Sequence, residues 1–156
     1  MERELRREDL RWRRELDREQ LERRAHACLE FLTVSRRQLR VVKKMRVALV
    51  NAAAGSATSR EEVGDREQDV ELAYAEVVET AVSLEVLCPA EIHEQVEVVI
   101  KKISELWSAL WTAWAATEGS SQDNVHDALA DAEKAEWRAR KARGALVELV
   151  REHLAR

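Results

Sequence analysis

Residues 28–54 read CLEFLTVSRRQLRVVKKMRVALVNAAA and contain neither glycine nor proline. Apolar residues recur in this stretch at spacings of three and four, which places them on one face of an α-helix. The residues of that face are Cys28, Leu29, Leu32, Leu39, Val42, Met45 and Leu49. Gly55 follows, and glycine is the usual residue of a left-handed helix C-terminus. The stretch therefore predicts a long amphipathic helix that ends near residue 54.

The same helix is predicted to extend toward the N-terminus as a charged arm over residues 1–27. Residues 1–25 carry nine bases and eight acids, and no glycine or proline occurs from residue 2 to residue 54. The few large apolar residues of the arm are Leu5, Leu10, Trp12, Leu16 and Leu21. Charged residues fall between them, so they make only a thin seam for a coiled coil. We interpret these five residues as a candidate surface for self-association.

Three further helices are predicted downstream, over residues 61–87, 89–117 and 122–154. Ser59 and Glu62 have the spacing of a capping box before the first of them, and Pro89 suits the first position of the second. Together with the long first helix they predict an all-α, antiparallel four-helix bundle over residues 28–156, with the N-terminal helix extending beyond it. In the alternative, residues 61–117 form one kinked helix and residues 1–29 pack beside residues 90–117.

Charge is divided between two adjacent segments of the chain. Residues 31–60 contain seven bases and no acid, whereas residues 61–97 contain twelve acids and one base. In an antiparallel hairpin with its midpoint near residue 58, oppositely charged residues of the two helices lie level. The predicted neighbours are Lys44 and Glu71, Arg40 and Glu76, and Arg37 and Glu79. Exposed pairs contribute only about 0–1 kcal/mol each, but several together favour one register, and we expect this internal pairing.

The basic segment also supports an alternative interpretation. Four of its bases, Arg36, Arg40, Lys43 and Lys44, cluster on one side of the predicted helix, and Arg37 joins them as a candidate contact. A basic helical stripe neutralises phosphates, so nucleic-acid binding through residues 36–46 is the alternative hypothesis. An acidic protein partner or a membrane surface would use the same stripe.

Three of the five tryptophans, Trp107, Trp111 and Trp114, share one helical face. In a hairpin that turns near residues 119–120, Trp107 lies level with Ala132 and Trp111 with Ala128. Large residues opposite small ones fill a core, so we expect these tryptophans to be buried. The alternative is a stripe that binds a partner, because tryptophan is enriched at binding hot spots.

The sequence argues against an enzyme and against a membrane protein. It carries no HExxH pair, phosphate-binding loop or nucleophile motif. No apolar stretch reaches the about 18 residues of a membrane span, and charge from residue 2 onward argues against a signal peptide. Cys28 and Cys88 fall level in the first hairpin, and we expect two reduced thiols there. We therefore expect a cytoplasmic protein without enzymatic activity, metal or cofactor.

The chain resembles small uncharacterised helical proteins of actinobacteria over roughly residues 10–110. These proteins have an Arg/Glu-rich leader helix and then an aromatic–Leu pair before an Arg-rich segment, here Phe31-Leu32 and Arg36-Arg37. They also show a Leu-x-x-Pro-x-x-Val/Ile step, which Pro89 and Ile92 match although the leucine falls one position late. The resemblance implies a helical fold and no known activity. Some such proteins carry a membrane helix.

These observations lead to two hypotheses for function. The first is a non-enzymatic interaction or scaffold protein that acts through helix–helix contacts, with a protein partner or a second copy of the chain as its ligand. The second is the nucleic-acid-binding protein described above, which we do not favour because the adjacent acidic segment supplies countercharges for the basic stripe.

Overall fold

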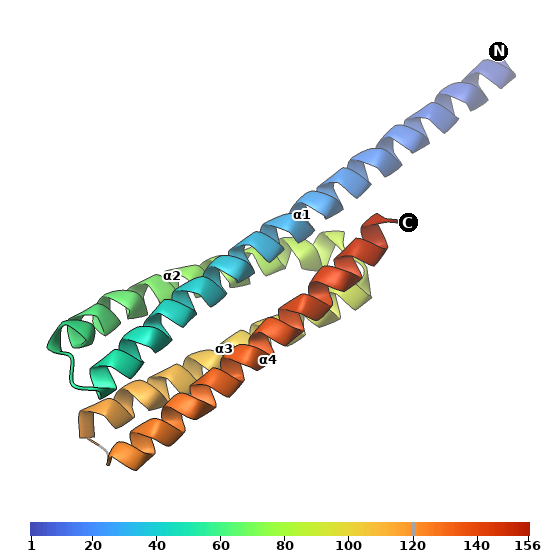
Figure 1. The fold of residues 1–156 in the computed structure, drawn as a ribbon. Helices are drawn as coiled ribbons and strands as arrows, with labels where there is room; N and C mark the ends of the chain where they lie inside the picture. Colours follow the sequence, from blue (N-terminus) through green and yellow to red (C-terminus); the bar gives the residue numbers. More distant parts are fainter. Residues whose placement is uncertain (120) are drawn as a thin grey trace.

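The computed structural model describes residues 1–119 and 121–156, apart from the side chains of residues 2, 58 and 59. Within these residues the chain forms helices and no strand (Figure 1). The helices are α1 (Glu2–Ala53), α2 (Ala57–Leu87), α3 (Ala90–Gly119) and α4 (Gln122–Leu154). The predicted all-α four-helix bundle with an extended N-terminal helix is confirmed.

Helix α1 ends as its sequence predicts. Gly55 has a φ of 97°, a left-handed conformation that glycine adopts without steric cost. The amide of Ser56 donates to the carbonyl of Asn51 at 3.2 Å, and that of Gly55 to Ala52 at 3.0 Å. This pair of bonds is a Schellman motif. Helix α2 then begins at Ala57, four residues earlier than predicted, and the Ser59 side chain of the predicted capping box lies outside the described residues.

Helices α2 and α3 are separate and run in opposite directions, so the alternative of one kinked helix is wrong (Figure 1). The chain turns at Cys88 and Pro89, and the carbonyl of Pro89 accepts the amides of Ile92 and His93 at 3.1 and 3.2 Å. Proline at this position removes no helical hydrogen bond, because the first amides of a helix have no partner within it.

The helices are arranged so that each lies beside its neighbour in sequence and α1 lies beside α4 (Figure 1). The closest packing is within two hairpins, α1 with α2 and α3 with α4. The contact of α1 with α4 is less extensive, and α2 and α4 lie on opposite sides of the bundle. The fold is thus two tight hairpins joined along a looser α1–α4 seam.

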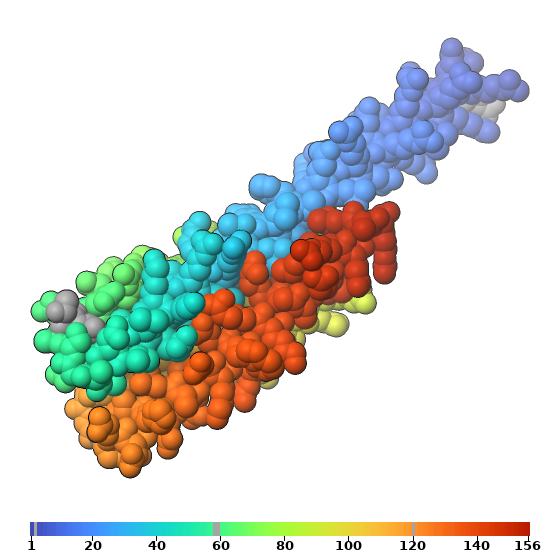
Figure 2. Space-filling view, in the orientation of Figure 1, coloured from blue at the N-terminus to red at the C-terminus, as the bar shows by residue number. Residues whose placement is uncertain are grey.

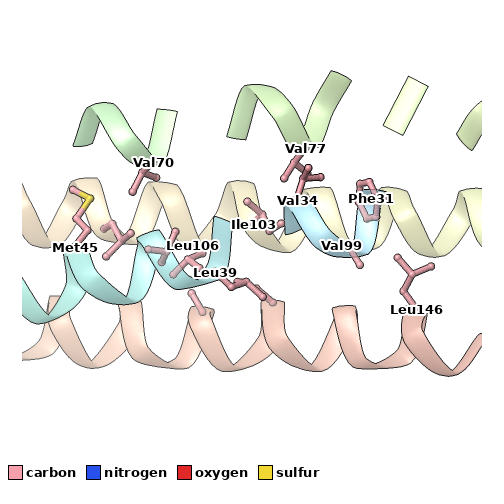
Figure 3. Packing of buried hydrophobic residues seen from close by; sticks show 14 of the residues in the cluster. Phe31, Val34, Leu39, Met45, Val70, Val77, Val99, Ile103, Leu106 and Leu146 are labelled. Carbon is pink, nitrogen blue, oxygen red and sulfur yellow. The ribbon is translucent and has the colours of Figure 1, made fainter. Parts of the chain in front are cut away.

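The core is a continuous apolar cluster drawn from all four helices (Figure 3). Helix α1 buries Phe31 completely, whereas Leu29, which the apolar pattern placed on the inner face, is 56% exposed. The true inner face of α1 includes two polar residues, Ser35 and Gln38, which are fully buried. A periodicity that counts apolar residues alone omits these buried polar positions. It therefore placed Leu29 on the inner face of α1, where the structure does not have it.

The tryptophans of α3 are less buried than predicted. Trp107 and Trp114 are half-buried at the edge of the core, and Trp111 is 39% exposed. Trp107 and Trp111 contact each other edge to face with ring centroids 6.3 Å apart. The inner face of α3 is instead occupied by Leu106, Leu110 and Ala113. Ala128 and Ala132 of α4 are buried in the same apolar cluster.

Candidate functional site

The basic residues of α1 face α4 across the looser seam of the bundle. Arg36, Arg40 and Lys43 of α1 line a hollow of about 390 Å³ together with Arg140 and Arg143 of α4. Leu39 and Gly144 complete its lining, so no acidic side chain of the described residues borders it. We call these five basic residues the basic groove. Figure 2 shows the face on which α1 and α4 lie side by side.

The groove continues along α1 toward the arm. An adjoining hollow of about 330 Å³ shares Arg36, Arg40 and Arg143 and adds Arg37 at its margin. Its remaining lining residues are the uncharged Leu29, Leu32 and Thr33. The two hollows together form one concave basic surface without a carboxylate among its described lining residues.

Arg143 is held in place by α1. Its Nε donates to Ser35 Oγ at 3.1 Å and its Nη2 to the carbonyl oxygen of Leu32 at 2.7 Å. Burial lowers the pKa of the Arg143 guanidinium below its ordinary value, and the positive charges of Arg36 and Arg140 lower it further. Like charges are therefore gathered in the groove at an electrostatic cost, since each disfavours the charged form of the others.

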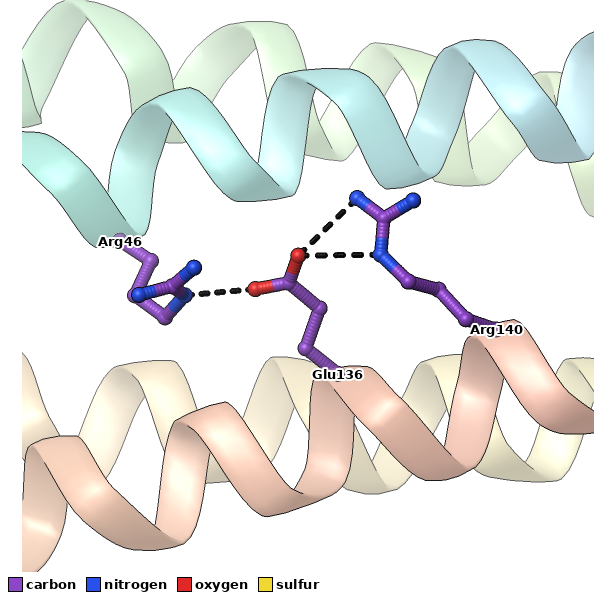
Figure 4. A network of polar contacts seen from close by, with 3 residues as sticks. All are labelled: Arg46, Glu136 and Arg140. Carbon is purple, nitrogen blue, oxygen red and sulfur yellow. Dashed lines mark hydrogen bonds and ion pairs between the residues drawn. The ribbon is translucent and has the colours of Figure 1, made fainter.

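One carboxylate lies below the groove and is fully engaged. Glu136, 5% exposed, accepts Arg46 Nε of α1 at 2.5 Å and Arg140 Nε and Nη2 at 3.1 and 3.0 Å (Figure 4). A buried carboxylate persists when it is paired and hydrogen-bonded, as here. Glu136 thus links α1 to α4 and offsets part of the charge of Arg140. The other three bases of the groove on α1, which are Arg36, Arg40 and Lys43, have no ion-pair partner among the described residues.

The predicted pairing of α1 with α2 occurs at one place. Arg37 Nη1 contacts Glu76 Oε2 at 2.8 Å, whereas the hairpin register predicted Glu79 as its partner. Arg37 thus reaches a carboxylate three residues, or about one helical turn, from the predicted one, although Cys28 and Cys88 meet as the predicted register requires. Arg40, predicted to meet Glu76, lines the basic groove instead. The predicted Arg40–Glu76 pair is therefore wrong, and the described residues show no ion pair between Lys44 and Glu71.

Sequence reasoning identified three of the five groove residues and missed Arg140 and Arg143. Lys44, which was predicted with them, is exposed but does not line the groove. The missed arginines lie in the segment EKAEWRARKAR over residues 133–143, which holds five bases and two acids. The available signals were the four bases of residues 138–143 and the spacing of three between Arg140 and Arg143, which puts both on one helical face.

The arm forms the second candidate site. All described residues from 1 to 23 are exposed, and continuous burial begins at Ala27 and Cys28. The five large apolar residues of the arm are between 41% and 65% exposed. Ion pairs four residues apart run along it, including Arg13 with Asp9 and Arg18 with Glu22, each at 3.0 Å. The arm is thus a single helix with apolar side chains in solvent and its charges largely satisfied within itself.

A pair of thiols lies where the arm joins the bundle. Cys28 Sγ is 3.5 Å from Cys88 Sγ, so the two residues lie level as the predicted register requires, and both thiols are free in this structure. The hydrogen bond from Cys28 and the charge of Arg24 lower the pKa of the Cys88 thiol, although partial burial opposes them. The same contact and burial raise the pKa of the Cys28 thiol.

The described residues hold no group of three or more His, Cys, Asp or Glu side chains that could bind a metal ion. No helix within them is long and apolar enough to span a membrane. Comparison with protein families, with curated proteins and with solved structures finds no match for this chain. The resemblance to actinobacterial helical proteins stays a prediction.

Proposed function

We propose that this protein is a non-enzymatic, cytoplasmic interaction protein that acts through helix–helix contacts, and that its arm binds the arm of a second copy of the chain. The observation that supports the proposal is the exposure of Leu5, Leu10, Trp12, Leu16 and Leu21 on a stretch of helix whose described residues from 1 to 23 are all exposed. Most helical stability in proteins comes from packing of an apolar face rather than from propensity. An unpacked helix of this length therefore gains stability when another helix covers it.

The apolar residues of the arm fall into two lines. Leu5, Trp12 and Leu16 are separated by seven and four residues, which places them on one side of the helix. Leu10 and Leu21 are separated by eleven residues, about three turns, and lie along a different side. The line through Trp12 is the more continuous and includes the residue type most enriched at binding hot spots. It is the proposed contact between copies.

The charge of the arm favours a second copy as its ligand. With nine bases and eight acids over residues 1–25, the arm has almost no net charge. A strongly charged arm would repel an identical one, whereas mixed charges at the edges of an apolar line are the usual flanks of self-pairing helices. Glu19 and Arg23, which pair with each other in this structure, are examples of residues that can exchange partners between copies.

The experiment is a measurement of mass in solution by sedimentation equilibrium on the full chain. We expect the wild type to assemble, and a variant with Trp12→Ala and Leu16→Ala to sediment as a monomer with unchanged helical circular dichroism. The matched control is Trp137→Ala, since Trp137 on α4 is 62% exposed and Trp12 65%. The control should assemble as the wild type does. A monomeric wild type, or an arm variant that still assembles, would contradict the proposal.

A further inference from the structure

The basic groove has the composition of a site for phosphate groups. Four of its five basic residues are arginines, whose planar guanidinium binds phosphate oxygens through two parallel hydrogen bonds. They come from two helices and line a concavity rather than a ridge, so several can reach one ligand at once. We propose that the groove binds a compact anion with two or three linked phosphate groups, across the seam between α1 and α4.

The size of the groove selects a compact ligand. Arg36 and Lys43 are seven residues apart, which corresponds to about 10 Å along α1. Acidic residues lie on α4 beyond both ends of the groove, with Glu133 on one side and Glu148 on the other, both exposed. The chain as a whole carries a net charge of −4. A long polyanion would meet these acids after a few phosphates, whereas a short one stays within the five bases.

The energetics of the empty groove also favour an anion. Arg36 and Arg140 lower the pKa of Arg143, so the bases repel one another when no anion lies between them. Arg143 is nevertheless fixed by Ser35 and by the Leu32 carbonyl, so its position is set before a ligand arrives. A bound anion would replace repulsion with attraction, and Arg140 and Arg143, which other contacts already hold, would lose little entropy on binding it.

The ligand would act as a bridge between the two hairpins. The α1–α4 contact is the least extensive of those that α1 makes with its two flanking helices, and Glu136 is its main charged link. Phosphates held by Arg36 and Arg40 on one side and Arg140 and Arg143 on the other would add a second link. Binding to the folded state alone raises the unfolding temperature, and the stabilisation grows with the logarithm of the free ligand concentration once that exceeds Kd. The groove lies on the bundle, whereas the proposed self-association surface lies on the arm. Each proposal can therefore be contradicted without affecting the other.

The test is isothermal titration of the full chain with inorganic triphosphate at low ionic strength. We expect saturable binding of one ion per chain, a higher unfolding temperature with the ion, and weakening at higher salt. The variant Arg36→Gln/Arg40→Gln/Lys43→Gln should bind at least about tenfold more weakly. Its own unfolding temperature, measured without ligand, should equal or exceed that of the wild type, because three mutually repelling charges are removed.

The matched control is Lys44→Gln, which removes an exposed charge next to the groove but outside it. Its affinity for triphosphate should stay within about twofold of the wild type, since a screened surface charge contributes little. Adenosine triphosphate should bind as tightly as the inorganic ion, because no aromatic residue lines the groove for a base to stack on. Tighter binding to a short DNA duplex than to triphosphate, equal weakening by Lys44→Gln, or unchanged binding by the triple variant would overturn the proposal.

Discussion

Helix α1 meets α2 on one side and α4 on the other, and the two contacts differ in chemistry. Toward α2 the packing is extensive, and the basic Arg37 forms an ion pair with the acidic Glu76. Toward α4 the packing is sparser, and Arg36, Arg40 and Lys43 face two more arginines. The same basic segment is thus neutralised on one side and concentrated on the other. The difference shows that a charged stripe on a helix serves more than one neighbour, and that its role depends on where each base points.

The largest expected effect is in the core that both contacts share. Phe31→Ala should destabilise the fold by about 3–5 kcal/mol, because Phe31 is completely buried and its loss leaves a cavity. Leu29→Ala is the control, two residues away and mostly exposed, and should cost less than about 1 kcal/mol. Chemical denaturation monitored by circular dichroism measures both. Similar losses for the two variants would place Leu29 on the inner face after all.

Next in size is the charged link between α1 and α4. Glu136→Gln should destabilise the protein by about 2–4 kcal/mol, because it leaves Arg46, only 19% exposed, without its carboxylate. Glu133→Gln removes an exposed carboxylate from the same helix and should change stability by less than about 0.5 kcal/mol. If the two variants unfold at the same denaturant concentration, Glu136 does not stabilise the contact between α1 and α4.

A smaller effect of opposite sign is expected at Gln38, on the inner face of α1. Its side-chain Nε2 and Oε1 are buried and have no hydrogen-bond partner in the structure. Because burying an amide without partners costs free energy, Gln38→Leu should stabilise the protein by about 1–2 kcal/mol. Ser35→Ala is the comparison, since Ser35 accepts a hydrogen bond from Arg143 and its loss should destabilise. A destabilised Gln38→Leu variant would mean that the amide has a partner in solution.

The smallest expected changes in stability compare the side of α1 that faces α2 with the side that faces α4. Arg37→Gln should cost about 0–1 kcal/mol, because it removes an exposed ion pair with Glu76. Arg36→Gln, one residue earlier, should leave stability unchanged or raise it slightly, because Arg36 faces Arg143 without a countercharge. Thermal unfolding at low and high salt measures both, and added salt should reduce each difference. Equal losses of stability from Arg37→Gln and Arg36→Gln would contradict the difference between the α1–α2 and α1–α4 contacts.

Much of the fold was predictable because local signals agree with it. Gly55 and Pro89 mark two of the turns, and predicted helix ends lie within four residues of the observed ones. The prediction of burial was weaker where polar residues occupy inner positions. Ser35, Gln38 and Glu136 are buried, and a search for apolar periodicity passes over all three. The three tryptophans of α3 show the converse, since large rings at helical spacing lie at the edge of the core while Leu106 and Leu110 fill it.

The two candidate sites also differ in how far the sequence could predict them. The exposed arm was predictable because residues 1–25 have too few apolar residues to bury, a property of composition alone. The basic groove was not, because it needs Arg140 and Arg143 from a helix about one hundred residues further along the chain. Residues 133–143 hold five bases and two acids, but that Arg140 and Arg143 face the bases of α1 appears only when α4 is placed beside α1.

The sequence by itself determined the four helices, their ends, their antiparallel order and the bare arm, because helix caps, apolar periodicity and composition act over a few turns of chain. Only the tertiary structure decided the partners of each charge. Arg37 pairs with Glu76, one helical turn from the predicted Glu79, and the rotation of α1 about its axis turns Arg36, Arg40 and Lys43 toward α4. Exposed ion pairs contribute too little free energy to fix such a rotation. The burial of Phe31, Leu49 and the other core residues contributes far more, and the charges occupy the positions that this packing leaves to them.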